Sequence, residues 1–131
     1  MTIKKINPDN MPDAGSMGYT QVTTSPPGEM IFMSGQVAWS RNGDPIPEAL
    51  KDQSAIAVEN VRKGLDAAGA GPDNITAMRV YVVGLTEENS AQAIPPVIKF
   101  FGGQAPCVTM IGVSSLASPD LKIEIEVMAV K

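Results

Sequence analysis

The sequence contains no histidine and one cysteine among its 131 residues. The absence of histidine excludes Ser-His-Asp and Cys-His catalysis, acid-base chemistry by imidazole and histidine-ligated metal sites. A single cysteine, Cys107, cannot form an intrachain disulfide or a cysteine-rich zinc site, and such usage fits a reducing compartment. The chemistry that remains must use carboxylates, hydroxyls and backbone amides.

Positive charge and long apolar runs are also scarce. Ten basic residues against fourteen acidic ones give a net charge of −4 and a pI of about 4.7, so the chain lacks the basic surface that binding of a phosphate backbone requires. No apolar run approaches the roughly 18 residues of a membrane-spanning helix, and no signal-peptide apolar region follows Lys4 and Lys5. We therefore expect no nucleic-acid or membrane partner and a cytoplasmic location.

The length and composition predict one folded domain over residues 1–131. A typical domain has about 150 residues, which leaves no room for a second one. Hydrophobic residues make up 44% of the chain and charged residues 18%, a balance typical of a globular protein with a packed core.

The first part of the chain is rich in proline and glycine, which predicts short strands and turns. Residues 19–23 are rich in β-forming side chains, and residues 29–36 follow the turn sequence Pro26-Pro27-Gly28. We expect these two segments to pair as a β-hairpin.

The periodicity then becomes helical. Apolar residues recur at helical spacing over residues 47–68, and Gly69 provides a C-terminal stop. A β-branched run predicts a buried strand over residues 75–85. A second helix is predicted between residues 87 and 101, although the pair Pro95-Pro96 favours a helix that begins only near Pro95.

The last segment, residues 121–130, alternates with the period of a strand. Ile123, Ile125 and Val127 share one face, which we expect to pack against the helices. Lys122, Glu124 and Glu126 share the other face. The order of elements predicts an α+β fold in which two helices cover one face of a sheet. The opposite face then needs a partner, and self-association is one solution.

Several segments together resemble the Rid proteins, the RidA/YjgF family, whose members are also labelled L-PSP endoribonucleases. The resemblance spans nearly the whole chain and rests on segments in a specific order. These are Gly18-Tyr19-Thr20-Gln21, residues 31–37 with Ser34-Gly35-Gln36, residues 58–61, residues 65–70 with Ala67-Ala68-Gly69, Phe100-Phe101-Gly102, Pro106, and residues 123–130 with Glu124-Ile125-Glu126.

The resemblance implies a chorismate-mutase-like α+β fold with a mixed sheet of about six strands. It also implies a homotrimer with ligand clefts between adjacent subunits and the face of Lys122, Glu124 and Glu126 turned toward them. RidA-type members hydrolyse reactive enamines and imines, such as 2-aminoacrylate, to a keto acid and ammonia. The resemblance implies no metal and no organic cofactor.

Two positions depart from the pattern of the family. RidA-type members bind the substrate carboxylate with an arginine in a Pro-Ala-Arg-Ser/Thr motif, because a planar guanidinium suits a carboxylate. Here the matching segment reads Pro106-Cys107-Val108-Thr109, so Val108 takes the place of the arginine, or Thr109 if the alignment shifts by one residue. Ile94 also stands where the family often has asparagine. A less charged substrate is therefore expected.

The other expected site residues match the family. Glu124 matches the glutamate credited with positioning the hydrolytic water. Tyr19, Ser34 and Gly35 are expected to contact the substrate beside Ile94, Cys107, Val108 and Thr109. Each also has an ordinary structural interpretation: Glu124 as a solvated strand residue, Tyr19 as a packing aromatic, Ser34 and Gly35 as turn residues. Cys107 is an improbable nucleophile because no histidine is present to deprotonate it, and free cysteines usually pack as small apolar residues.

Three functions fit the sequence to different degrees. The first is a cofactor-independent hydrolase, or deaminase, of a small imine, enamine or related carbonyl derivative, with water held by Glu124. The alternative is a non-catalytic trimer that binds a small hydrophobic metabolite in the same clefts. Ribonuclease activity ranks last, because the negative net charge and the absence of histidine oppose stabilisation of a phosphate transition state.

Overall fold

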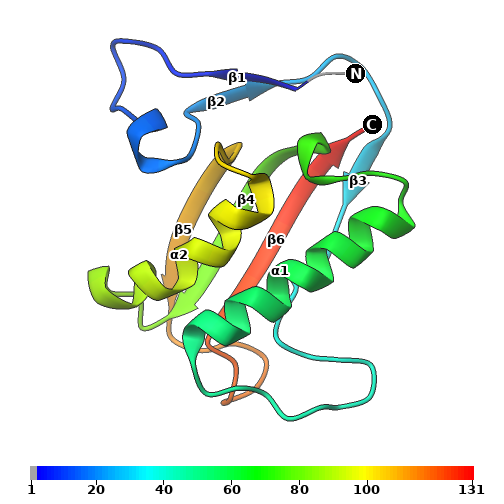
Figure 1. Ribbon diagram of the computed structural model, residues 1–131, viewed down its shortest axis with the longest axis vertical. Coiled ribbons are helices and arrows are strands. Elements are labelled where there is room, and N and C mark those ends of the chain that lie inside the picture. The colour runs from blue at the N-terminus through cyan, green and yellow to red at the C-terminus, as the bar shows by residue number, and fades with distance from the viewer. Residues whose placement is uncertain (1–2) are drawn as a thin grey trace.

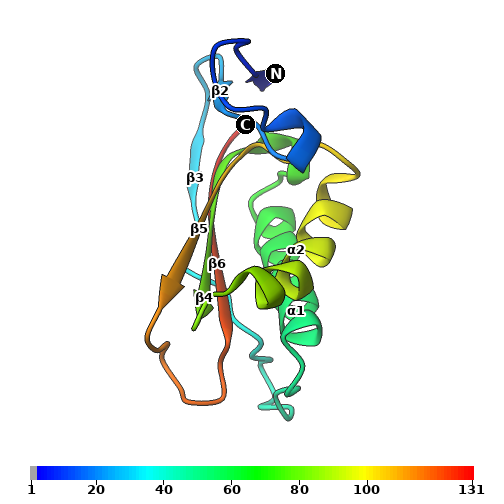
Figure 2. The same ribbon diagram turned by 90° about the vertical axis from the view of Figure 1, so that its left-hand side faces the viewer.

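Two helices lie on one face of a twisted sheet (Figure 1). The structure is a computed structural model that describes residues 3–131. The side view separates a layer of strands from a layer of helices and leaves the far face of the sheet uncovered (Figure 2). The elements in chain order are β1 (Lys4–Ile6), η1 (Gly15–Met17), β2 (Val22–Thr24), β3 (Met30–Phe32), α1 (Leu50–Ala67), η2 (Pro72–Asn74), β4 (Ile75–Val83), α2 (Glu87–Phe101), β5 (Cys107–Val113) and β6 (Ile123–Val130).

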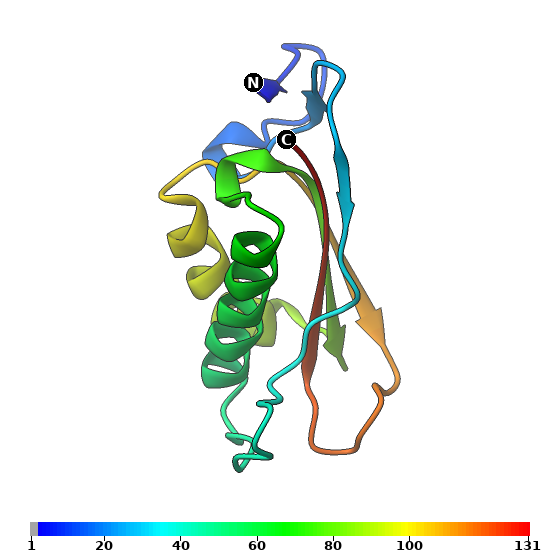
Figure 3. The same ribbon diagram turned by 90° about the vertical axis from the view of Figure 1, so that its right-hand side faces the viewer.

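The strands form a mixed sheet and a separate ribbon. The sheet has the order β3-β6-β4-β5, in which β4 and β5 are parallel and the other pairs are antiparallel. Strands β1 and β2 pair only with each other and lie at one end of the molecule (Figure 3). The predicted α+β fold, with two helices on one face of a mixed sheet and six strands in all, is confirmed.

Strand β6 shows how the alternating sequence positions the site. It lies between β3 and β4, and its residues Ile123, Ile125 and Val127 are buried beneath the helices. Glu124 and Glu126 are half-buried on the opposite, uncovered face. The predicted alternation over this segment is confirmed, because a pleated strand turns successive side chains to opposite faces.

The predicted hairpin is wrong. Strand β2 pairs with β1 and not with β3, with Ile6 opposite Val22, and β3 pairs with β6, with Phe32 opposite Met128. Sequence patterns identify strand-forming segments, but the partner of a strand is decided by packing between distant segments, which no local pattern contains.

Helix α2 runs unbroken through both of its prolines. The helix begins at a capping box, in which the Thr86 hydroxyl accepts from the Asn89 amide at 3.1 Å and the Asn89 side chain accepts from the Thr86 amide at 2.7 Å. Each proline lacks an amide hydrogen for the carbonyl four residues earlier, but these carbonyls belong to exposed residues that water can reach. The helix therefore begins at Glu87, and the later start near Pro95 that the two prolines favoured is wrong.

The side chain of Gln53, near the start of α1, is fully buried and ties the helix to the segment that leads into β6. The Gln53 amide donates to the carbonyls of Pro47 and Asp120 at 2.9 and 2.8 Å, and its oxygen accepts from the Lys122 amide at 2.9 Å. These three bonds satisfy both the amide nitrogen and the oxygen of Gln53. Two of them hold Asp120 and Lys122, so Gln53 fixes the chain just before Glu124. No helix within residues 3–131 combines the length and the apolar character needed to cross a lipid bilayer.

Candidate functional site

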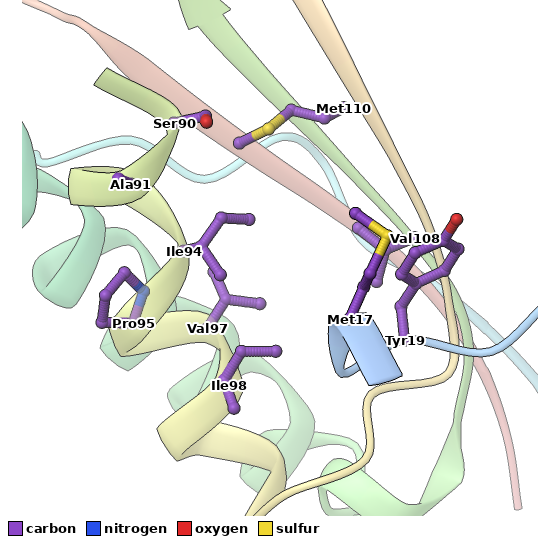
Figure 4. A pocket seen from close by; sticks show the side chains of 10 residues that line it. All are labelled: Met17, Tyr19, Ser90, Ala91, Ile94, Pro95, Val97, Ile98, Val108 and Met110. Carbon is purple, nitrogen blue, oxygen red and sulfur yellow. The ribbon is translucent and has the colours of Figure 1, made fainter. Parts of the chain in front are cut away.

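An apolar cavity of about 590 Å³ opens between α2 and the edge strand β5. In Figure 4, Ile94, Val97 and Ile98 project from α2 toward Tyr19 and Val108 on the other side. The full lining is Met17, Tyr19, Ser90, Ala91, Ile94, Pro95, Val97, Ile98, Val108 and Met110. None of these side chains carries a charge, and only the hydroxyls of Tyr19 and Ser90 are polar. The cavity therefore favours an uncharged, apolar group.

Hydrogen bonds between two distant segments hold Tyr19 at this cavity. The Tyr19 carbonyl accepts from the Gln104 side chain at 2.6 Å, and the buried Thr20 hydroxyl donates to the Ala105 carbonyl at 2.7 Å. Gly18 comes just before with a φ of 86°, and a Cβ there would lie 3.1 Å from Ile98. Glycine thus allows this segment to approach α2 closely.

Glu124 lies on the opposite face of the sheet, in a hollow of about 420 Å³. Gly35 is pressed against it, so that a Cβ on Gly35 would lie 2.1 Å from Oε2 of Glu124. The approach is fixed by an isolated antiparallel bridge in which Gln36 and Ile125 exchange backbone hydrogen bonds of 2.7 and 2.9 Å. Ser34 is exposed next to the hollow, and its carbonyl accepts from the Gln36 side chain at 2.9 Å.

Cys107 and Thr109 form a third group, away from both cavities. They line a narrow cavity of about 70 Å³ on the uncovered face, together with Arg79 and Glu126. The Cys107 thiol is half-buried, 3.5 Å from the Gln21 carbonyl oxygen and 3.6 Å from the Thr23 hydroxyl. These contacts are those of a packed thiol and provide no base for a nucleophile.

A polar cluster lies beside Glu124 on the uncovered face. The Tyr81 hydroxyl donates to Oε1 of Glu126 at 2.9 Å, and Arg79 approaches the same oxygen at 3.4 Å. The hydrogen bond to Glu126 raises the pKa of the Tyr81 hydroxyl above its ordinary value, and partial burial and the negative charges of Glu126 and Glu124 add to the rise. Tyr81 is opposite Glu124 in the register of β4 and β6.

The expected site residues thus separate into groups within one chain. Tyr19, Ile94 and Val108 meet at the apolar cavity, whereas Gly35 and Glu124 meet in the hollow on the other side of the sheet. The two groups do not join within the single chain. Strand alternation also separates Val108, which faces α2, from its neighbours Cys107 and Thr109, which face the uncovered side.

The sequence reasoning missed several residues that line these spaces. Met17, Ser90 and Met110 line the apolar cavity, and Trp39 and Asn60 line the hollow at Glu124. A tryptophan four residues after Gly35 was a usable signal, because tryptophan is rare in polar loops and occurs once in this chain. Within residues 3–131, no three histidine, cysteine or acidic side chains gather closely enough to hold a metal ion.

Comparisons with known proteins agree with the resemblance found in the sequence. A family model described as "Endoribonuclease L-PSP" matches residues 10–131. The chain is 32% identical over 108 residues to the protein named "Putative reactive intermediate deaminase TdcF" of Escherichia coli (strain K12), covering 79% of this chain and 81% of that protein.

Two crystal structures extend the comparison to the fold. YyfB from Yersinia pestis, described as a member of the conserved Rid protein family, has 32% sequence identity and a TM-score of 0.93 over 100% of both chains. Escherichia coli TdcF with bound serine has 30% identity and a TM-score of 0.71 over 79% of this chain and 82% of that one. The likeness to YyfB covers every segment that lines the cavity and the hollow.

Proposed function

The chain belongs to the Rid family, whose family model is described as endoribonuclease L-PSP, and we propose that it is a cofactor-independent hydrolase of small, uncharged imines or enamines. The proposal rests on two features that the chain combines. One carboxylate, Glu124, lines an open hollow, and a separate apolar cavity is lined by no charged side chain. Relatives named for deamination of reactive intermediates support the reaction class.

The reaction requires only water and a base. The oxygen of water bonds to the imine carbon while Glu124 accepts one of its protons, and the electron pair of the C=N bond moves to nitrogen, which takes up a proton from solvent. Glu124 then returns its proton to the nitrogen of the carbinolamine, and the C–N bond breaks as the hydroxyl group releases its proton to solvent, which leaves a carbonyl compound and ammonia. An enamine first gains a proton on carbon to become the imine. A positioned general base contributes about 10²- to 10⁴-fold to such a step.

The substrate class follows from the apolar cavity. Val108 and Ile94 line it, and no lysine or arginine does. A carboxylate placed there would lose its water without gaining a counter-ion, which is strongly unfavourable. We therefore propose a substrate without the carboxylate of an amino-acid derivative.

We also propose that the working site lies between subunits of a homotrimer in the cytoplasm. Tyr19, Ile94 and Val108 lie on one side of the sheet of a protomer and Gly35 and Glu124 on the other. A neighbouring copy that brings its helix-side cavity to the hollow of the first would complete one site from two halves. Self-association also covers the sheet face that the helices leave open (Figure 2).

Replacement of the base tests the proposal. We expect Glu124→Gln to lower imine turnover by about 100-fold or more, with an unchanged assembly size in light scattering. Glu126→Gln is the matched control, because Glu126 shares the strand and the face but does not line the hollow. Unchanged turnover in Glu124→Gln would remove Glu124 from the mechanism.

The second candidate, a non-catalytic binder of a small hydrophobic metabolite, is favoured by the size and apolar lining of the same cavity. It predicts a ligand retained through purification and no acceleration of any imine. Turnover that depends on Glu124 would exclude it.

A further inference from the structure

Trp39 is a half-exposed aromatic residue at the hollow that contains Glu124. It is the one tryptophan of the chain, and 48% of its surface remains accessible. The hollow is lined by Gly35, Gln36, Val37, Trp39, Asn60, Ala117 and Glu124. A large exposed aromatic in a concave surface is typical of a binding site, because burial in the core would stabilise the fold more.

The backbone that carries Trp39 is held firmly. The Asn60 side chain, on α1, donates to the carbonyls of both Val37 and Trp39 at 2.9 Å. Val37 and Ala38 are buried immediately before Trp39, and Gln36 is bridged to Ile125 on β6. The exposure of Trp39 therefore comes from a fixed position and not from a loose loop.

The charge of the hollow selects the sign of its ligand. Glu124 is the one charged residue among the seven that line it. Lys122 lies two residues before Glu124, immediately ahead of β6. Its ammonium group donates to the Glu48 carbonyl and does not enter the lining of the hollow. A carboxylate and the face of an indole both attract a cation, and neither has a basic neighbour in the lining to compensate it.

We propose that Trp39 and Glu124 form a subsite for a planar nitrogen cation, the protonated C=N group of the substrate. This inference rests on the proposed function and deepens it, because protonation on nitrogen makes the imine carbon more open to attack by water. Trp39 contacts the cation and sets the preference for a protonated imine over the neutral carbonyl product. The neutral product is then bound more weakly and leaves.

A stable pair of probes tests the subsite without turnover. Isobutyramidinium is a planar cation that resembles a protonated imine, and isobutyramide is its neutral counterpart of nearly equal shape. We expect isobutyramidinium to change the fluorescence of Trp39 saturably and to bind about 2- to 30-fold more tightly than isobutyramide. Equal affinity for the two probes, or no fluorescence change with either, would overturn the proposal.

Three variants separate the contributions, with binding measured by calorimetry. Glu124→Gln should weaken the cation and leave the amide unchanged, whereas Glu126→Gln should change neither. Trp39→Phe should keep most of the preference for the cation, and Trp39→Leu, which keeps apolar bulk but has no aromatic face, should retain only the part that Glu124 provides. Equal effects of Phe and Leu would contradict the aromatic contact.

The same experiments distinguish this inference from the proposed function. Selective binding of isobutyramidinium without hydrolysis of any imine would contradict the proposed hydrolase activity and support the cation subsite. Hydrolysis that depends on Glu124, with no preference between the two probes, would keep the hydrolase and reject the role of Trp39.

Discussion

Replacing Gly35 by alanine should separate activity from stability. The new Cβ would lie 2.1 Å from Oε2, 2.5 Å from Cδ and 2.8 Å from Cγ of Glu124. Contact at an ordinary distance begins at 3.4 Å, so the carboxylate oxygen must move from 2.1 Å to at least 3.4 Å, a shift of about 1.3 Å. A misplacement of about 1 Å in a catalytic group costs on the order of 100-fold in rate.

The fold itself should tolerate the change. Gly35 does not have a positive φ, and the atoms that must move, Cγ, Cδ and Oε2, all belong to the one flexible side chain of Glu124. Alanine restricts the unfolded chain, which stabilises by about 0.4–1 kcal/mol, while a displaced rotamer of Glu124 costs about 0.5–1.5 kcal/mol. These effects nearly cancel, so the free energy of unfolding should change by less than about 1 kcal/mol.

The assay compares kcat/KM for an uncharged imine, followed by ammonia release, with the midpoint of urea unfolding. Gly71→Ala is the matched control, because Gly71 also lacks a positive φ and a Cβ there would have nothing within 4 Å. We expect Gly35→Ala to lose about 100-fold in kcat/KM and Gly71→Ala to lose none. Full activity in a correctly assembled Gly35→Ala protein would refute the placement of Glu124 at the reacting centre.

Three further predictions concern charge, ionisation and packing. Val108→Arg should accelerate hydrolysis of an amino-acid-derived imine by about 10- to 100-fold in an ammonia-release assay, because it places a counter-ion for the carboxylate in the cavity, and no gain would argue against Val108 as the anchor position. Tyr81 is held protonated by Glu126, so it should stabilise the fold fully below its unfolded pKa of about 10 and lose that contribution as the pH rises through its higher folded pKa. In Glu126→Gln, an absorbance titration should show the ionisation of Tyr81 at a lower pH than in the native protein. An unmoved ionisation would contradict Glu126 as the cause of the raised pKa. Gln53→Leu should lower the free energy of unfolding by about 3 kcal/mol in urea titrations, because three partly buried backbone groups lose their partner, and a loss near zero would show that water replaces it.

Local patterns in the sequence predicted the first helix and the strands β4 and β6 well, whereas β5 was not located. The alternation of Ile123, Ile125 and Val127 with Glu124 and Glu126 appears unchanged in β6, because this pattern directly encodes one buried face. The helix from 87 to 101 was predicted less well. Buried Ala93 and Val97 and the capping box at its start outweigh the two prolines, and neither packing nor exposure can be read from the segment alone.

The candidate site was predicted by residue type but not by geometry. Val108 and Thr109 differ by one place in the chain, yet they face opposite sides of the sheet. A shift of one residue in an alignment therefore changes which side chain enters the apolar cavity. Glu124 and Gly35 are 89 positions apart, and their contact depends on the bridge between Gln36 and Ile125. Only the folded chain shows that the expected residues form separate groups.

The most direct test of the central claim measures ammonia release from two freshly generated imines of similar size, one uncharged and one derived from an amino acid. The account predicts that the native protein accelerates hydrolysis of the uncharged imine more than that of the carboxylated one, and that Glu124→Gln abolishes the acceleration while Glu126→Gln retains it. Failure to accelerate the uncharged imine, or the same rate in the native protein and Glu124→Gln, would contradict it.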